Sequence, residues 1–430
     1  MRNRKLVILT CVILVLSLLT ITGCGGGGTA PAASNGGADR SGELTFDDAQ
    51  INWTMQSIWV PSITLWRGDK YFVDLVNRLA LGDLYIEYNE GGALVTTSDE
   101  VFDAVRTGAL DMSTDWPSYW EGRDTAFSLV TSTPMMLAPG DYMLWYWQAG
   151  GLELTQQLYD EYNIVWYPHY VNTPEAGQRT NVPIREPEDY AGLRLRQCGR
   201  MQAVILEEMG AGAIFMPGAD IYLSLDRGVI DGAEFSVPEV DWSMNFHEVT
   251  QYLVTPGWHQ PGPVGGVMIN KDSYNALPDR VKFIFKEAAM ATMMWTWTYF
   301  EYASIEYQAR FTEAGTETSR LSDEVLSELQ ERSFAMVLED ARANPNHAKL
   351  AFSQIKYLYE FQEWREIQEP FMHGRNPEGI DEVYAEMEQI ARDHGVYDEV
   401  IAMEAAVRER MKAQELWQPG TPYELNPIAQ

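Results

Sequence analysis

Short strand-like runs alternate with helix-like runs in the first half of this 430-residue chain. Residues 51–60 alternate apolar and polar side chains as a half-buried strand does, and residues 71–81 have helical spacing. Residues 84–88 then fit a strand, residues 98–107 a helix and residues 109–114 another strand. A strand–helix–strand rhythm of this kind indicates βαβ units, so the pattern predicts an α/β fold.

One helix-to-strand turn occurs twice, at residues 102–111 and again at residues 222–231. Each copy has an aromatic residue, an apolar residue three positions later, a glycine, two apolar residues and an aspartate. A glycine in the left-handed region can end a helix and lead into a buried strand. Two similar α/β lobes would explain the repeat, and so would coincidence between two ordinary turns.

The first residues predict export from the cytoplasm. A basic stretch, residues 1–5, precedes the uncharged and mostly apolar residues 6–21, which are too few for a typical membrane-spanning helix and suit a signal peptide. Ile-Thr-Gly-Cys at residues 21–24 resembles the lipobox of bacterial lipoproteins. The resemblance implies cleavage before Cys24 and a lipid on this cysteine. An uncleaved membrane anchor is the alternative, and either places the folded part in the periplasm or at the cell surface.

Beyond this segment the chain predicts a folded part without disulfides. Cys11 lies in the apolar segment and Cys24 is the expected lipidation site, so only Cys198 remains. The last long helical stretch could reach a partner chain, which makes a homodimer an expectation. We expect a signal peptide at 1–23, a flexible tether at 24–48, lobe I mainly at 49–170, lobe II mainly at 171–270, a helical region packing on and linking the lobes at 271–416, and a tail at 417–430.

The charge and the motifs narrow the function. A formal net charge of −31 and the absence of a basic stripe argue against nucleic-acid binding. An anionic ligand would need arginines or a metal ion to reverse this field locally. No Walker loop, Gly-x-Ser-x-Gly or His-Glu-x-x-His occurs, so neither a nucleotide site nor a familiar hydrolase is expected. Cys198, in a run with Arg194, Arg196 and Arg200, is a candidate nucleophile, although a lone cysteine is more often a small buried residue.

Two stretches resemble the solute-binding proteins of tripartite ATP-independent periplasmic (TRAP) transporters. Residues 184–196, IREPEDYAGLRLR, are similar to the family signature I-x-x-P-x-D-hydrophobic-x-G-x-K-hydrophobic-R, with Arg194 at the lysine position. Residues 209–217 and 222–234 follow the family pattern in order. The resemblance covers about residues 52–314 and implies a two-lobed periplasmic solute-binding protein fold, α/β in class, with a cleft between the lobes and a helical C-terminal region.

Three loops resemble the branch of this family that binds 2-oxo and 2-hydroxy monocarboxylates with a metal ion. Residues 115–120, DWPSYW, are similar to its S-W-P-x-Y-W segment, and residues 256–262, PGWHQPG, to its P-G-W-H-E-P-G loop. Residues 233–238, AEFSVP, are similar to its x-E-W-x-x-P loop. Phe235 stands where relatives carry tryptophan and Gln260 where they often carry glutamate, which leaves the metal and the ligand size open.

Candidate ligand contacts follow from strand spacing and from the resemblance. Arg194 and Arg196 share one strand face, and an arginine at a strand end can hold a carboxylate with two hydrogen bonds. The resemblance selects Arg196 and leaves Arg194 at the surface. Arg179 falls where many relatives place a second polar contact, with a surface position as the alternative. Further expected contacts are Asn172 and the aromatic residues Trp116, Tyr119 and Trp59, which could equally belong to the core.

Candidate metal ligands cluster around Glu234. This glutamate follows a buried apolar run, and a carboxylate at such an edge needs a partner, for which a hard cation would serve. By resemblance, Glu234 and the backbone carbonyl of Phe235 are metal ligands, and Glu175 and Gln260 are the further candidates. The resemblance implies a sodium or calcium ion that bridges the substrate, and no nucleotide.

The expected function is that of a solute receptor and not of an enzyme. The resemblance implies a protein that is lipid-anchored outside the cytoplasm, binds a small 2-oxo or 2-hydroxy monocarboxylate, and delivers it to TRAP membrane subunits. One alternative is a metal-assisted surface hydrolase that uses Glu234, Glu175 and His259. Another is a sensory binding protein that presents its ligand to a receptor kinase.

Overall fold

The computed structural model describes residues 49–368, 392, 397–398 and 402. The predictions for the signal peptide, the tether, Cys24, the last helix and the tail lie outside these residues. None of the helices that it describes is both long and apolar enough to span a membrane.

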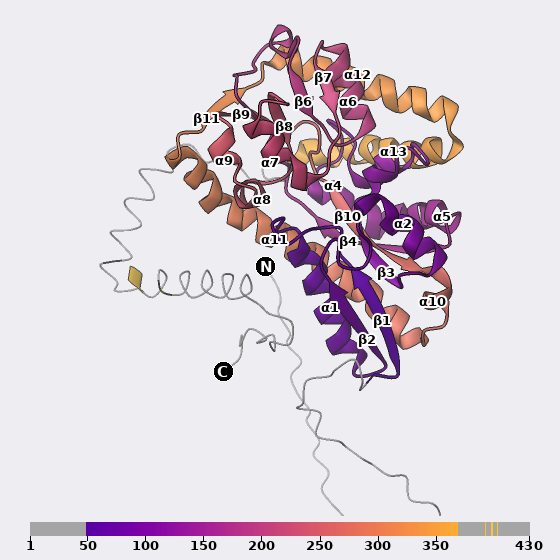
Figure 1. Ribbon diagram of the computed structural model, residues 1–430. Coiled ribbons are helices and arrows are strands. Elements are labelled where there is room, and N and C mark those ends of the chain that lie inside the picture. The colour runs from indigo at the N-terminus through magenta and orange to yellow at the C-terminus, as the bar shows by residue number, and fades with distance from the viewer. Residues whose placement is uncertain (1–48, 369–391, 393–396, 399–401, 403–430) are drawn as a thin grey trace, which may run out of the picture. The chain divides into compact units, whose positions relative to one another are not determined.

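Two sheets organise the described part of the chain (Figure 1). The first has five strands in the order β2-β1-β3-β10-β4, with β10 antiparallel to both of its neighbours. We call this sheet and the helices that pack on it the first lobe. Its strands are β1 (Ile51–Gln56), β2 (Leu84–Asn89), β3 (Met112–Asp115), β4 (Ile164–Val171) and β10 (Val264–Asn270), and its helices are α1 (Trp66–Ala80), α2 (Ser98–Thr107), the 3-10 turn η2 (Pro117–Trp120), α3 (Phe127–Thr131), α4 (Pro139–Gln148), α5 (Gly151–Asp160) and α10 (Lys271–Asn275).

The second lobe is built on a sheet of six strands in the order β11-β9-β5-β8-β6-β7. Strand β11 lies inside the stretch that the sequence predicts to be nearly all helical. It forms because its backbone pairs in parallel with β9 over four residues. The strands are β5 (Gln178–Thr180), β6 (Arg194–Arg196), β7 (Gly212–Ile214), β8 (Gly232–Glu234), β9 (Tyr252–Thr255) and β11 (Glu317–Arg320), and the helices are the 3-10 turn η3 (Pro187–Tyr190), α6 (Arg200–Glu208), α7 (Gly218–Asp226), α8 (Pro238–Ser243) and α9 (Phe246–Val249).

The repeated sequence forms the same unit in both lobes. Helix α2 ends at Gly108, with φ 80°, and leads into β3, while α7 is followed by Gly228, with φ 63°, and leads into β8. The aspartate that ends each copy accepts a hydrogen bond from a backbone amide of a neighbouring strand. Asp111 accepts a hydrogen bond from the Thr54 amide at 2.9 Å, and Asp231 accepts one from the Arg194 amide at 2.8 Å. This shared bonding favours two similar lobes over coincidence.

Three long helices end the described continuous part of the chain: α11 (Asp279–Glu313) precedes β11, and α12 (Asp323–Ala343) and α13 (Pro345–Gln368) follow it. Helix α11 runs alongside both lobes and contacts α1 and β4 of the first and α8 of the second (Figure 1). Its buried side includes Met293, Tyr299 and Phe300. Met290 and Met294 are exposed instead, so the methionines divide between core and surface.

Polar contacts also join the two lobes. Glu239 of α8 accepts hydrogen bonds from Thr64 at 2.7 Å and from Arg67 at 2.6 Å. Glu121, just after η2, accepts one from the amide of Arg200 at 2.7 Å, at the start of α6. Because both glutamates are buried, these bonds stabilise the lobes in mutual contact more than exposed bonds would.

Asp115 closes β3 inside the core of the first lobe and generates a pH prediction. It accepts hydrogen bonds from the Trp120 indole at 2.6 Å and from the Tyr159 hydroxyl, and burial raises its pKa from 3.8 to about 7. A group whose pKa is higher in the folded state than in the unfolded state contributes stability that is fully present below the unfolded-state pKa. This contribution is lost as the pH rises through the folded-state pKa. We expect the wild type to lose roughly 3 kcal/mol relative to Asp115→Asn between pH 4 and pH 7.

Urea unfolding of both proteins across this pH range measures the difference. Because both proteins contain the other buried acids, the difference between them excludes the contribution of groups such as Glu121, whose pKa burial raises in the same way. Parallel pH profiles for the two proteins would contradict the assignment of this titration to Asp115.

Candidate functional site

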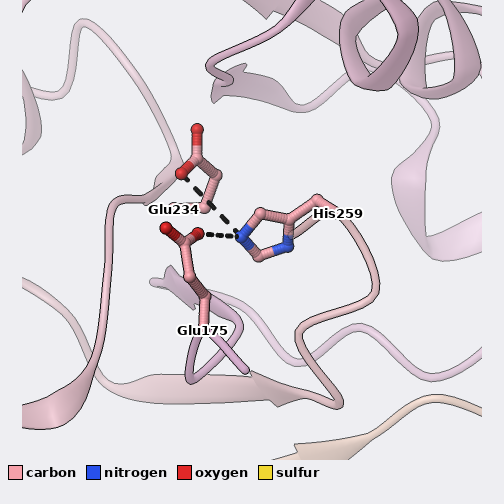
Figure 2. A group of neighbouring side chains, drawn as sticks. All are labelled: Glu175, Glu234 and His259. Carbon is pink, nitrogen blue, oxygen red and sulfur yellow. Dashed lines mark hydrogen bonds and ion pairs between the residues drawn. The ribbon is translucent and has the colours of Figure 1, made fainter. Parts of the chain in front are cut away.

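Four chain segments bring ionisable residues together where the lobes meet, and Figure 2 shows three of these residues, Glu175, Glu234 and His259. Arg196 ends β6 and Glu234 ends β8, and these parallel neighbours share an edge of the second sheet. Glu175 follows β4 and His259 precedes β10, on two of the segments along which the chain crosses between the sheets. Ligand sites favour the carboxyl ends of parallel strands and the junction between lobes.

Arg196 and Glu234 form a buried ion pair at the centre. The Arg196 Nη1 donates to Glu234 Oε1 at 2.7 Å and to the Glu234 carbonyl at 2.9 Å, and its Nε donates to the Met216 carbonyl at 3.2 Å. The Cys198 amide also donates to Glu234 Oε1. Because the two side chains are 1% and 0% exposed, each charge depends on the other for compensation.

His259 and Glu175 lie against this pair. The His259 Nε2 is 2.7 Å from Glu175 Oε2 and 3.8 Å from Glu234 Oε2, as Figure 2 shows. Burial lowers the His259 pKa to about 3 and raises the pKa values of both glutamates. The histidine is therefore neutral near pH 7 and does not compensate a carboxylate.

The cluster has the donor atoms of a cation site. One atom each from Glu175, Glu234 and His259 lies within 4.8 Å of the other two. Within the described residues, Glu175 Oε1, Glu234 Oε2 and the Gln260 Oε1 are buried without a hydrogen-bond partner. Hard cations such as calcium take several oxygen ligands of this kind, so the residues fit a bound cation.

Arg179 does not point to this cluster. It lies in β5, fully buried, and its Nε donates to Asp241 at 2.9 Å while its guanidinium lies 3.6 Å from the centre of the Phe311 ring. These contacts fit neither the predicted ligand contact nor the surface position left as its alternative. Removing the Arg179 side chain would leave the buried Asp241 carboxylate without its positive partner. A change of this kind typically costs about 3–5 kcal/mol of stability.

Gln178, its neighbour, is the residue that sequence reasoning missed. Gln178 pairs directly with Glu234 across β5 and β8, whereas Arg179 pairs with Ala233. Opposed residues of an antiparallel pair point to the same face, so Gln178 lies on the face of Glu234. Within the described residues its two amide atoms are buried without partners. Strand alternation signals that Gln178 and Arg179 face opposite ways, although not which of them faces the site.

The remaining predicted contacts lie at different distances from the cluster. The Asn172 Nδ2 donates to the Ser236 hydroxyl at 2.9 Å, two residues beyond Glu234. The Phe235 ring is 5.4 Å from the Arg196 guanidinium. Trp116 and Trp59 are buried and pack edge to face at 5.6 Å, an arrangement that serves the core as well as a pocket wall.

Tyr119 and Cys198 border the site from opposite lobes. Burial raises the pKa of the Tyr119 hydroxyl, which keeps it a neutral donor. Burial also raises the pKa of Cys198 to about 12, despite the neighbouring arginines, so the thiol is protonated and a poor nucleophile. Arg194 is exposed and pairs with Asp231 at 2.8 Å, and Arg200 pairs with Asp340.

Comparisons with known proteins agree with this architecture. The monocarboxylate 2-oxoacid-binding periplasmic protein of Nostoc sp. is 27% identical over 73% of this chain and 83% of its own length. A TRAP transporter solute-binding protein from Bordetella bronchiseptica, solved with calcium and picolinate, has a TM-score of 0.73, 23% identity, and coverage of 80% of this chain and 99% of its own. A TRAP periplasmic solute-binding protein from Colwellia psychrerythraea, with bound calcium and pyruvate, has a TM-score of 0.69, 25% identity, and coverage of 74% and 97%.

The predicted two-lobed α/β fold and the TRAP-type resemblance are confirmed by these likenesses. A family model, described as bacterial extracellular solute-binding protein, family 7, matches residues 56–342, more than half of the chain. This protein therefore belongs to family 7 of the bacterial extracellular solute-binding proteins.

Proposed function

We propose that this protein is the extracytoplasmic receptor of a TRAP-type transporter and binds a small 2-oxo or 2-hydroxy monocarboxylate together with a cation. The observation that carries the proposal is the buried group of Arg196, Glu234 and Glu175 between the lobes, with carboxylate oxygens left over for a cation. The bound acid would then be delivered to membrane subunits. The calcium and pyruvate of the Colwellia protein and the name of the Nostoc protein support this ligand class.

The charges of the site favour a divalent cation. Cation binding requires Glu175 and Glu234 to be ionised, and these two carboxylates and one guanidinium then sum to one negative charge, because His259 is neutral. A monocarboxylate bound alone would raise this to two negative charges in a buried place, which is unfavourable. A calcium ion with a monocarboxylate brings the sum to zero, whereas sodium leaves one negative charge. Gln260 removes a charge that relatives often carry, but Glu175 supplies one in the same cluster.

Arg196 and Tyr119 would orient the ligand carboxylate. Arg196 offers a planar set of N–H donors at the end of β6, and Tyr119 offers a neutral hydroxyl from the other lobe. A ligand held by residues of both lobes favours their contact, which is how a receptor of this architecture couples binding to closure. Calcium would supply charge compensation and a second point of attachment, with Glu234, Glu175 and Gln260 as the nearby oxygen donors.

A hydrolase is the weaker alternative. A general base must be unprotonated yet basic near the working pH, and a His259 pKa of about 3 makes this histidine a very weak base. The relatives compared above are binding proteins by name. A sensory role remains an alternative that uses the same site.

The first test is cation-dependent ligand binding. We expect chelator-stripped protein to be stabilised little by pyruvate alone and by on the order of 3 °C or more when calcium and pyruvate are both present at high multiples of their Kd. Thermal unfolding with each component alone, with both, and with sodium in place of calcium gives the comparison. A Glu175→Gln variant lowers the negative charge by one, so its preference should move from calcium towards sodium.

Two outcomes would contradict this proposal. One is stabilisation by pyruvate to the same extent with and without any cation. The other is no stabilisation by any 2-oxo or 2-hydroxy acid in a wider screen. An unchanged cation preference in Glu175→Gln would remove Glu175 from the cation site.

The second test concerns the guanidinium of Arg196. Arg196→Lys keeps the charge opposite Glu234 but loses the planar fork, so we expect the Kd for pyruvate with calcium to rise about tenfold or more. Arg194→Lys is the matched control, since Arg194 lies on the same strand but is exposed. Isothermal titration calorimetry of both variants measures the effect, and equal affinities would rule out the assigned role.

Membrane attachment is the third test, and it rests on residues 1–24 alone. We propose that Cys24 carries a lipid, so a fatty-acid probe supplied to expressing bacteria should label the wild type and leave Cys24→Ala unlabelled. Cys11→Ala is the control and should be labelled normally. Label on Cys24→Ala would disprove the anchor. Dimerisation through the last helix stays a prediction.

A further inference from the structure

A short loop at residues 215–217 connects β7 to α7 and lies directly over the ion pair. The Met216 carbonyl accepts the hydrogen bond from Arg196 Nε at 3.2 Å, and the Phe215 ring lies 6.0 Å from the Arg196 guanidinium. One residue of this loop therefore holds the arginine while its neighbour lies beside it. Phe215 is nevertheless 52% exposed, whereas Arg196 is 1% exposed. An exposed ring thus lies beside a buried charge.

The same loop touches the opposite lobe. The Phe215 and Tyr119 rings meet edge to face, with centroids 5.7 Å apart and planes at 70°. At Gly218, the first residue of α7, an added Cβ would lie 2.9 Å from the Ile63 Cδ1 and 2.6 Å from the Phe235 ring. An added side chain would therefore meet Phe235 of its own lobe first and then the end of the Ile63 side chain. The loop thus contacts the first lobe through Phe215, and Gly218, the residue that follows the loop, lies close to Ile63 of that lobe.

We propose that Phe215 is a lid residue that closes the entrance to the binding site against Tyr119 and limits the ligand to small acids. When the lobes separate, the ring pair breaks and Arg196 becomes accessible; when they meet, the two rings shut this path. The size limit rests on the proposed carboxylate-binding function, whereas the closing contact does not. An edge-to-face pair of this kind contributes enough to change an opening equilibrium by about twofold to tenfold.

A ligand-independent experiment uses Cys198 as a reporter of opening. Cys198 is 3% exposed, and its sulfur lies 3.6 Å from the hydroxyl of Ser118, the neighbour of Tyr119 in the opposite lobe. We expect Phe215→Ala to accelerate alkylation of Cys198 by N-ethylmaleimide about threefold or more, and Phe215→Tyr to label at the wild-type rate. Peptide mass spectrometry of the full chain separates Cys198 from Cys11 and Cys24.

Phe283→Ala is the matched control. Phe283 is also an exposed phenylalanine, 64% exposed, but it lies on α11 away from the loop. Its removal should leave the labelling rate unchanged. Equal labelling rates for Phe215→Ala and Phe283→Ala would overturn the lid, and so would a rate for Phe215→Tyr that matches Phe215→Ala.

Ligand size is measured on the same variants with calcium present. Phe215→Ala should release pyruvate about threefold to tenfold faster and should improve the affinity for 4-methyl-2-oxopentanoate relative to pyruvate by at least threefold. Unchanged release and unchanged preference would overturn the size limit. Failure of the wild type to bind any such acid, with faster Cys198 labelling in Phe215→Ala, would leave the lid standing and reject the proposed ligand class.

Discussion

The ion pair between Arg196 and Glu234 is the interaction on which the site depends. Two charges without access to water are stable only when each is compensated and hydrogen-bonded, and the ends of β6 and β8 supply both conditions. The pair leaves Glu175 without a positive partner, because burial keeps His259 neutral, and burial raises the pKa of Glu175 accordingly. In the proposed function, an acidic protein thereby holds a small anion through one arginine and a cation, and its sequence has no basic stripe.

The architecture explains why these residues meet. Each lobe contains the same helix–glycine–strand unit, closed by an aspartate that binds a backbone amide. The chain crosses between the sheets after β4 and again before β10, and these crossings carry Glu175 and His259. The second lobe contributes the ion pair, and the first contributes Tyr119. A site assembled in this way responds to the distance between the lobes, which is the property a closing receptor requires.

Part of this candidate site could be predicted from sequence patterns. Glu234 follows a buried apolar run and Arg196 ends a strand whose alternation is visible in the sequence, and the structure brings these two candidates together as a buried ion pair. Arg179 and Gln178 show the limit of such reasoning. Alternation says that they face opposite ways, but only the pairing of β5 with β8 shows that Gln178 shares the face of Glu234. Cys198 shows a second limit, since burial outweighs its arginine neighbours in setting its pKa.

The sequence alone determined the α/β class and the repeated unit, because periodicity and local turn chemistry depend on consecutive residues, whereas the family was indicated by the resemblance of its motifs. It also determined which residue types could hold an anion and a cation. The tertiary structure decided which of them lie together: Glu175 with His259 across 84 positions, and Phe215 with Tyr119 across the two lobes. Contacts between distant segments depend on strand order and on desolvation, and neither is a property of any local stretch of sequence.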